Sequence, residues 1–202
     1  MKTRNMLIVS LLAAALFATS CEKDSFDIQG QGPVVTQTLE LDEFTGIDFL
    51  GTDKVFISYG TEQSVVVEGH ANIIERIKTK VKNNIWDIEL EEGGYKNYEL
   101  TYYLTLPLLE NVYNTGTGNV VITEFPAQES LNIRIMGTGS FLGYPMELNT
   151  CEVDVTGTGS VEVSVNDQLD VSIDGTGHVY YKGNPIVNAD IVGTGSVSRF
   201  KN

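Results

Sequence analysis

Two regular columns of polar side chains are the residues of this sequence best suited to binding. The first is a threonine that recurs at similar intervals, and the second lies two residues further on in each copy. The threonines are Thr117, Thr138, Thr158, Thr176 and Thr194, and the second column is Asn119, Ser140, Ser160, His178 and Ser196. Such columns could bind a glycan or order water. The alternative is structural, because Thr and Ser also suit an exposed strand edge and hydrogen-bond along a stack.

Acidic residues form a second candidate site. Asp154 and Asp190 occupy the same place in their copies, and Asp174 lies on the next outward column. Paired carboxylates could serve a glycosidase or a lyase, and several oxygen ligands could hold Ca²⁺. These acids are interspersed with Ser172 and Arg134, which is typical of a solvated face. We therefore predict no catalytic residue among them.

Other signatures of catalysis or of a cofactor do not fit this sequence. The calcium-binding nonapeptide repeat needs an Asp where this chain has Val or Phe. The two histidines, His70 and His178, lack metal-ligand spacing. Gly137-Thr138-Gly139 has Leu142 where a dinucleotide-binding loop has its third glycine, and the sequence has no Gly-x-Ser-x-Gly elbow. We expect no metal, no cofactor and no enzymatic activity.

The recurring threonine is the centre of a Gly-Thr-Gly triplet that occurs five times, with starts 18 to 21 residues apart. Apolar residues flank each triplet at even offsets, as Val153, Val155, Val161 and Val163 do around Gly157. Strict alternation is a strand signal, because successive side chains of a strand point to opposite faces. The even positions are therefore predicted to face one core and the odd positions water.

This period predicts the architecture. A unit of 18–21 residues is too short for a strand-helix-strand crossover but matches one coil of a parallel β-helix. The glycines would permit a positive φ or a close approach of the neighbouring coil. A weaker sixth copy surrounds Gly51, with Asp53 in place of the second glycine. We predict an all-β chain, a parallel β-helix of about six short coils.

The period breaks between Gly60 and Pro107, where a small antiparallel insertion is predicted at about 60–106. Short apolar strands are expected at 65–67, 85–90 and 100–106, with Asn83-Asn84 as a tight turn. Asn72 is expected to cap a brief helix that runs to Ile77.

The N-terminus has the pattern of an export signal. Lys2 and Arg4 precede an apolar run at 6–17 that is too short to span a membrane, and small residues follow it. Residues 18–21, Ala-Thr-Ser-Cys, resemble a bacterial lipobox, which implies cleavage before Cys21 and its acylation. An ordinary secretory signal is the alternative. Residues 1–20 are thus a predicted lipoprotein signal peptide, 21–32 an acidic tether and 33–202 a single domain.

Charge narrows the classes of partner. The chain has a formal charge of −14, which becomes −16 when Lys2 and Arg4 leave with the signal peptide. Such a surface repels nucleic acid and anionic head groups. The membrane is expected as a partner only through acylated Cys21, and Cys151 is then a small core residue.

The motifs together resemble a known family. The Gly-Thr-Gly-Ser/Asn/His repeat, the junction at 104–109 and the closing stretch at 179–185 are similar to the auto-transporter adhesin head GIN domain family over residues 44–200. The resemblance implies a right-handed β-helix that is exported and lipid-anchored, and it suggests adhesion to a glycan or protein. The competing hypotheses are a polysaccharide hydrolase or lyase and a structural envelope protein. An outer membrane lipoprotein is expected, at the cell surface or facing the periplasm.

Overall fold

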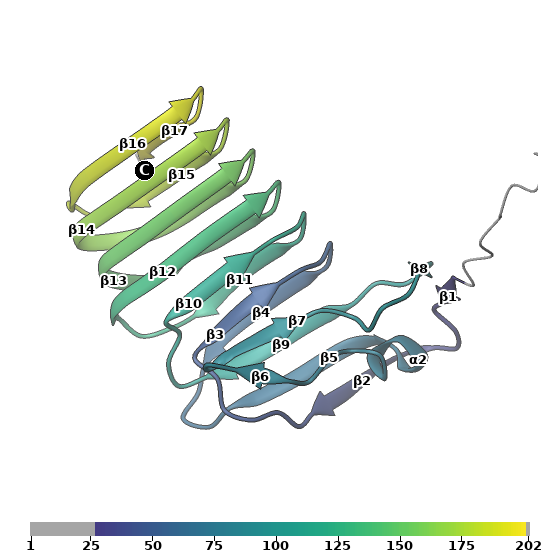
Figure 1. Cartoon of the computed structure of the whole chain (residues 1–202). Coiled ribbons are helices and arrows are strands. Elements are labelled where there is room, and N and C mark those ends of the chain that lie inside the picture. Colours follow the sequence, from purple (N-terminus) through teal and green to yellow (C-terminus); the bar gives the residue numbers. More distant parts are fainter. Residues whose placement is uncertain (1–26, 201–202) are drawn as a thin grey trace, which may run out of the picture.

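The computed structural model describes residues 27–200, which form a mostly β protein (Figure 1). The predicted signal peptide, Cys21 and the first part of the tether lie outside the described residues. One strongly curled, mostly parallel sheet holds 15 strands, and β1 and β8 pair separately. The helix α2 spans Ala71–Ile74. The strands are β1 (Ile28–Gln29), β2 (Val34–Leu39), β3 (Gly46–Phe49), β4 (Lys54–Tyr59), β5 (Ser64–His70), β6 (Val81–Lys82), β7 (Ile85–Ile88), β8 (Tyr95–Lys96), β9 (Thr101–Leu106), β10 (Asn111–Asn114), β11 (Asn119–Glu124), β12 (Gln128–Gly137), β13 (Ser140–Gly157), β14 (Ser160–Gly175), β15 (His178–Lys182), β16 (Ile186–Gly193) and β17 (Ser196–Arg199).

The repeats stack in register and form two runs of parallel strands. We call the run that precedes the glycines the upstream ladder; it includes β3, β10, β12, the second halves of β13 and β14, and β16. The run that follows them is the downstream ladder, with β4, β11, the first halves of β13 and β14, β15 and β17. The chain crosses from one ladder to the other in every repeat, and the upstream strands lie side by side in Figure 1. The structure thus confirms that the chain is mostly β and that its sheet is mostly parallel, as the repeat predicted.

The glycine triplets line up along the stack, because Gly137, Gly157, Gly175 and Gly193 are register partners. The first glycine of these copies has a φ between +118° and +133°. A Cβ on Gly157 would also lie 2.5 Å from the carbonyl oxygen of Gly137 in the coil before. Both reasons that the sequence suggested for glycine therefore apply, a left-handed backbone and a close neighbouring coil.

The core lies at the even positions, as predicted. Val153, Val155, Val161 and Ile173 are each at most 1 % exposed. Asn114 interrupts this apolar interior, and it is fully buried with its Nδ2 donating to the carbonyl oxygen of Gly118 at 2.8 Å. The weaker copy around Gly51 belongs to the stack, since Ile47 and Val55 pair with Val112 and Val120 in register.

The stretch at 60–106 covers the N-terminal end of the stack. The pairs β5–β9 and β6–β7 are antiparallel, as predicted, and Asn83 and Asn84 make the tight turn with positive φ. The strand β2, which precedes this stretch, also pairs antiparallel with β5. However, β7 pairs in parallel with β3, and β9 pairs in parallel with β4. The stretch thus extends both ladders as well as ending them.

The predicted helix cap is wrong. The helix spans Ala71–Ile74 with His70 at the cap position. Asn72 instead bonds two backbone groups near β1, donating to the oxygen of Gln29 at 2.8 Å and accepting from the nitrogen of Gln31 at 3.0 Å. This long-range partner holds residues 29–31, inside the predicted tether, against the domain.

The C-terminal coil departs from the predicted inside–outside frame. Ala189 and Ile191 occupy core register positions, yet Ala189 is exposed and Ile191 is 38 % exposed. The physical reason is that, in the described part of the chain, β16 has a neighbouring strand on one side only. Inward side chains of an end coil have nothing beyond them to pack against.

Candidate ligand-binding surface

The five threonines of the first predicted column lie together on the edge formed by the turns, and all five are exposed. Main-chain bonds hold these turns, because the amides of Thr158, Thr176 and Thr194 each donate to a glycine carbonyl oxygen of the preceding coil at 2.9 Å. The column therefore exists as predicted, and its side chains face outward. Whether it binds a ligand stays a prediction.

The second predicted column plays a different part. Ser140, Ser160, His178 and Ser196 are half-buried and adjacent in register. The hydroxyls of Ser140 and Ser160 lie 2.9 Å apart, and Nδ1 of His178 lies 2.9 Å from the hydroxyl of Ser196. These side chains bond to each other along the stack, which agrees with the structural interpretation of this column.

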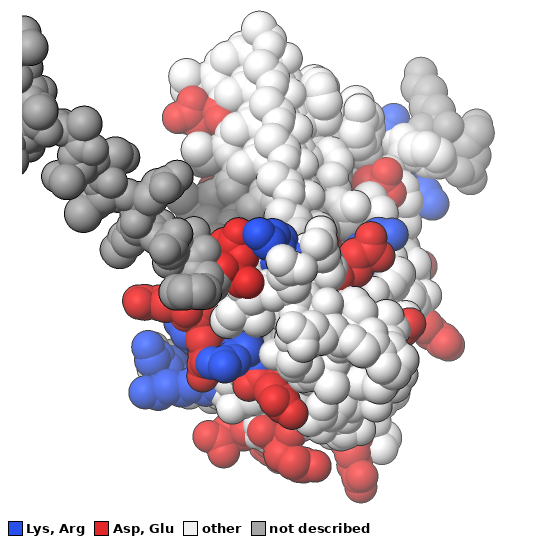
Figure 2. Space-filling model, turned by 90° about the vertical axis from the view of Figure 1, so that its right-hand side faces the viewer, with Lys and Arg blue, Asp and Glu red and all other residues white. Residues whose placement is uncertain are grey.

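Charge is unevenly spread over the face shown in Figure 2. Acidic and basic side chains gather on its lower half, over the N-terminal elements, and ion pairs such as Lys96–Asp27 and Arg76–Glu91 lie among those elements. The upper half, over the stacked coils, is mostly uncharged.

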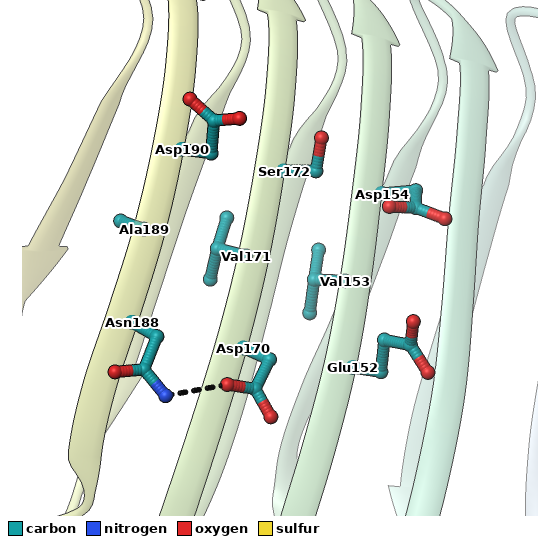
Figure 3. A pocket seen from close by; sticks show the side chains of 9 residues that line it. All are labelled: Glu152, Val153, Asp154, Asp170, Val171, Ser172, Asn188, Ala189 and Asp190. Atoms are coloured by element: carbon teal, nitrogen blue, oxygen red, sulfur yellow. Dashed lines mark hydrogen bonds between the residues drawn. The ribbon is translucent and has the colours of Figure 1, made fainter.

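The outer face of the upstream ladder carries a polar groove. It consists of two hollows, of about 320 Å³ and 520 Å³, which share Glu152 and Asp170. We call their joint surface the polar groove; its polar side chains are Glu110, Asn111, Ser130, Asn132, Thr150, Glu152, Asp154, Gln168, Asp170, Ser172, Asn188 and Asp190. Figure 3 shows the end of the groove nearest the C-terminus.

Alternation and register together build the groove. Side chains at odd offsets from the first glycine of each triplet point away from the core, while Val153 and Val171, at even offsets between them, are buried. Parallel pairing then sets Glu152, Asp170 and Asn188 side by side in one row. Asp154, Ser172 and Asp190 form the next row, and Figure 3 shows both.

The predicted acids are therefore only partly brought together. Asp154 and Asp190 share a row as expected, but Ser172 separates them. Asp174 lies outside the groove, with Thr156 and Val192 as its register partners.

Hydrogen bonds and an ion pair fix two carboxylates of the groove as acceptors. Asp170 accepts from Nδ2 of Asn188 at 2.7 Å and from Nε2 of Gln168 at 2.6 Å. Asp154 pairs with Arg134 at 3.3 Å, and the guanidinium of Arg134 lies 5.4 Å from the centre of the Tyr113 ring. Asn132 presents a buried Oδ1 that has no partner among the described residues.

Sequence reasoning missed the row of Asn132, Glu152, Asp170 and Asn188. A signal was present, because each of these residues stands five places before the first glycine of its triplet. The row combines amides and carboxylates, so neither a pattern of paired acids nor a pattern of hydroxyls reveals it.

The free cysteine of the described residues lies in the interior. Cys151 lies in the core, as predicted, and burial raises the pKa of its thiol to about 12, so the thiol is protonated. Residues 27–200 contain no group of three or more His, Cys, Asp or Glu side chains arranged to hold a metal ion. No helix in the same range is long and apolar enough to cross a membrane.

The fold and the groove define a repetitive, largely parallel β protein with a polar outer face. The chain belongs to the family described as "Putative auto-transporter adhesin, head GIN domain", which matches residues 43–143 and 127–185. This confirms the family resemblance of the sequence motifs. The description of the family is not an enzymatic one.

A solved structure shares the fold at low identity. A putative adhesin from Bacteroides fragilis NCTC 9343 is 18 % identical with a TM-score of 0.59, and the match covers 86 % of this chain and 100 % of that one. A putative lipid binding protein from Parabacteroides distasonis ATCC 8503 is 15 % identical with a TM-score of 0.49, covering 87 % and 100 %. No curated protein matches the chain.

Proposed function

We propose that this protein is a cell-envelope adhesion module that binds a glycan in the polar groove. The observation that carries the proposal is the groove itself, a continuous outward surface lined by carboxylates, amides and hydroxyls that main-chain stacking holds in rows. A sugar presents many hydroxyls, which both donate and accept hydrogen bonds. The carboxylates and amides of the groove complement both roles.

The groove favours a neutral or cationic ligand over an anionic one. Glu110, Glu152, Asp154, Asp170 and Asp190 line it, and Arg134 beside Asp154 is the nearby cation. A preformed site on rigid strands loses little conformational entropy on binding. Repeated rows also allow one long ligand to contact several coils at once.

Binding is better supported than turnover. A glycosidase needs one carboxyl as acid and another as base or nucleophile across a scissile bond. In the groove Asp170 is held by two amides and Asp154 by Arg134, and Ser172 stands between Asp154 and Asp190. These contacts suit fixed acceptors, so we propose that the protein is not an enzyme.

We further propose that the two ladders are the faces of a right-handed parallel β-helix. The support is that each repeat passes once through both ladders and that the glycine triplets stay in register. The exposed threonines of the turn edge then form a second exterior surface, beside the polar groove, that is a candidate for binding a glycan or protein ligand.

We also propose a cellular location for the protein. Acylation of Cys21 would tether the domain to the bacterial outer membrane, with the domain at the cell surface or facing the periplasm. A Cys21→Ser variant should leave the membrane fraction, and retention there would refute the anchor. Digestion of the wild-type chain by protease added to intact cells would demonstrate surface display.

A glycan array followed by titration calorimetry tests the ligand class. Asp170→Ala should weaken binding of a captured glycan about tenfold or more, since it removes a charged acceptor and leaves two amides without their partner. Thr176→Ala, on the turn edge, is the matched control and should bind as the wild type does.

The outcomes separate the hypotheses. Loss of binding in Thr176→Ala with retention in Asp170→Ala would move the site to the threonine edge. Release of reducing ends from the bound glycan, abolished by Asp154→Asn, would favour the enzyme. A wild-type chain that captures no glycan would refute the proposal.

A further inference from the structure

The C-terminal end of the stack is open, whereas the N-terminal end is covered. Among the described residues β16 pairs only with β14, and β17 only with β15, so the outer edges of both strands keep free backbone donors and acceptors. The N-terminal end, in contrast, carries the antiparallel strands β2, β5 and β6 and the helix α2 (Figure 1). An open strand edge is a template for pairing with another chain.

The last coil also changes the chemistry of its outer face. In the two preceding coils, the positions in register with Ile186 are Thr150 and Gln168. Those in register with Val192 are Thr156 and Asp174. Ile186 is 71 % exposed and Val192 is 64 % exposed. Two large apolar side chains thus replace polar ones at the ends of β16, a strand with a free edge.

These residues are arranged so that β16 complements itself. In an antiparallel pair of two copies centred on Ala189, Ile186 of each copy lies opposite Val192 of the other. Asn188 then lies opposite Asp190, an amide donor facing a carboxylate acceptor. On the inner face Val187 lies opposite Ile191, which is 38 % exposed in the single chain.

We propose that the open end of the stack is a homodimer interface in which β16 pairs antiparallel with β16 of a second copy. A two-fold axis through Ala189 makes the contact isologous, so it closes after two copies. Pairing bonds the backbone of the eight-residue β16, joins the two cores and covers Ile186, Ile191 and Val192. The polar groove of each copy then runs up to the interface, because Asn188 and Asp190 belong to both.

Disulfide trapping in the full-length chain tests the pairing. Residues directly opposite in an antiparallel pair have Cα atoms about 4.5–5.5 Å apart, which suits a disulfide. Ala189→Cys should therefore run mainly at twice the monomer mass on a non-reducing gel after mild oxidation. Thr158→Cys, exposed on the turn edge, is the matched control and should remain monomeric.

A second variant separates pairing from chance collision. Adding Ile186→Lys and Val192→Lys to Ala189→Cys should lower the cross-linked fraction at least tenfold, since like charges would meet across the axis. Both side chains are exposed in the single chain, so resistance to protease should match that of the wild type. Sedimentation equilibrium of the wild-type chain should give a dimer, and the double-lysine variant a monomer.

Either of two results would overturn the proposal. One is cross-linking of Ala189→Cys that does not exceed that of Thr158→Cys in folded protein. The other is a wild-type chain that does not form a dimer in sedimentation, either because it stays a monomer at every concentration or because a different protein occupies its C-terminal end.

Discussion

A single inward side chain tests the alternation that builds the stack. Ile173 is 1 % exposed, and Thr176, three residues later, is exposed on the turn edge. Ile173→Asp should lower the free energy of unfolding by about 3 kcal/mol or more, because it buries a charge without a partner. Thr176→Asp should change it by less than about 0.5 kcal/mol. Urea unfolding measures both, and the reverse order would contradict the assignment of faces.

Asp48 gives a pH dependence whose sign is opposite to that of a paired acid. Burial, followed by the charges of Asp87 and Glu89, raises its pKa above 3.8. Its Oδ1 is buried without a partner among the described residues. Because the folded carboxyl binds its proton more tightly than the unfolded one, this residue costs stability as the pH rises from about 4 through the raised pKa.

Asp48→Asn should therefore stabilise the protein at pH 7 by up to about 1 kcal/mol, the scale of a cross-strand pair of like charges. At pH 3, where both carboxyl forms are protonated, the variant should match the wild type. Urea unfolding at the two pH values gives the comparison, with the exposed Asp167→Asn as control. A variant less stable than the wild type at pH 7 would show that Asp48 has a stabilising partner.

Single residues were predictable from the sequence where the alternation alone decides their place. Cys151 was expected in the core and is there, with 3 % exposed. Asn72 was not predictable, because its partners near β1 are about 40 residues away in sequence and outcompete a local helix cap. Asp53 is similar: in place of a second glycine, its carboxylate accepts from the amide of Leu100 at 3.1 Å and thereby ties β9 to the stack.

The turn between the ladders is the element on which stacking depends most. Gly157 has a φ of +118°, and a Cβ there would lie 2.5 Å from the carbonyl oxygen of Gly137. Gly157→Ala should cost about 2–4 kcal/mol, from backbone strain together with overpacking against backbone that belongs to another coil.

Gly93 provides the matched control for this substitution. A Cβ on Gly93 would have its nearest neighbour at 3.4 Å, an ordinary contact, and its φ is not positive. Gly93→Ala should therefore stay within about 0.5 kcal/mol of the wild type in the same urea unfolding measurement. Equal effects of the two substitutions would mean that the coils are less tightly stacked than the register indicates.

At the scale of elements, the periodic part of the chain was predictable and the aperiodic part only locally. The alternation of apolar and polar residues around each triplet predicted the strands β12 to β16, because every repeat has the same pattern. The strands at 60–106 were found one by one from the same local signals. However, β7 continues the upstream ladder because it pairs with β3, and β9 continues the downstream ladder because it pairs with β4. Both pairs join strands that are far apart in sequence. No local pattern specifies such a partner.

The polar groove, too, was predictable from the sequence only in part. Its side chains lie on odd positions that the alternation assigns to the exterior, so their exposure was predictable. Which of them become neighbours depends on the register between coils of unequal length, and the bend between the ladders absorbs that difference, with register shifts between Leu142 and Glu147 and between Leu148 and Thr150.

At the scale of the whole molecule, the position of a coil in the stack decides whether its inward side chains are buried, and the repeat pattern is the same in a central coil and an end coil. An inward residue is buried only if another coil lies beyond it, and Ile173 and Ile191 have the same offset from their glycines yet are 1 % and 38 % exposed. In a protein whose units contact only their neighbours, stability is close to a sum of unit and interface terms. The C-terminal coil lacks one interface term, so it should open first.

Amide hydrogen exchange measures this gradient and links it to pairing of the open end. In dilute protein the amides of β16 should be protected least and those of β13 and β14 most, because an end strand has one neighbour and a central strand has two. If two copies pair through β16, its protection should rise with protein concentration while that of β13 stays constant. The Ile186→Lys/Val192→Lys variant should keep β16 poorly protected at every concentration. Protection of β16 equal to that of β13 in the dilute monomer would show instead that the edge is stable alone, and the energetic reason for pairing would be lost.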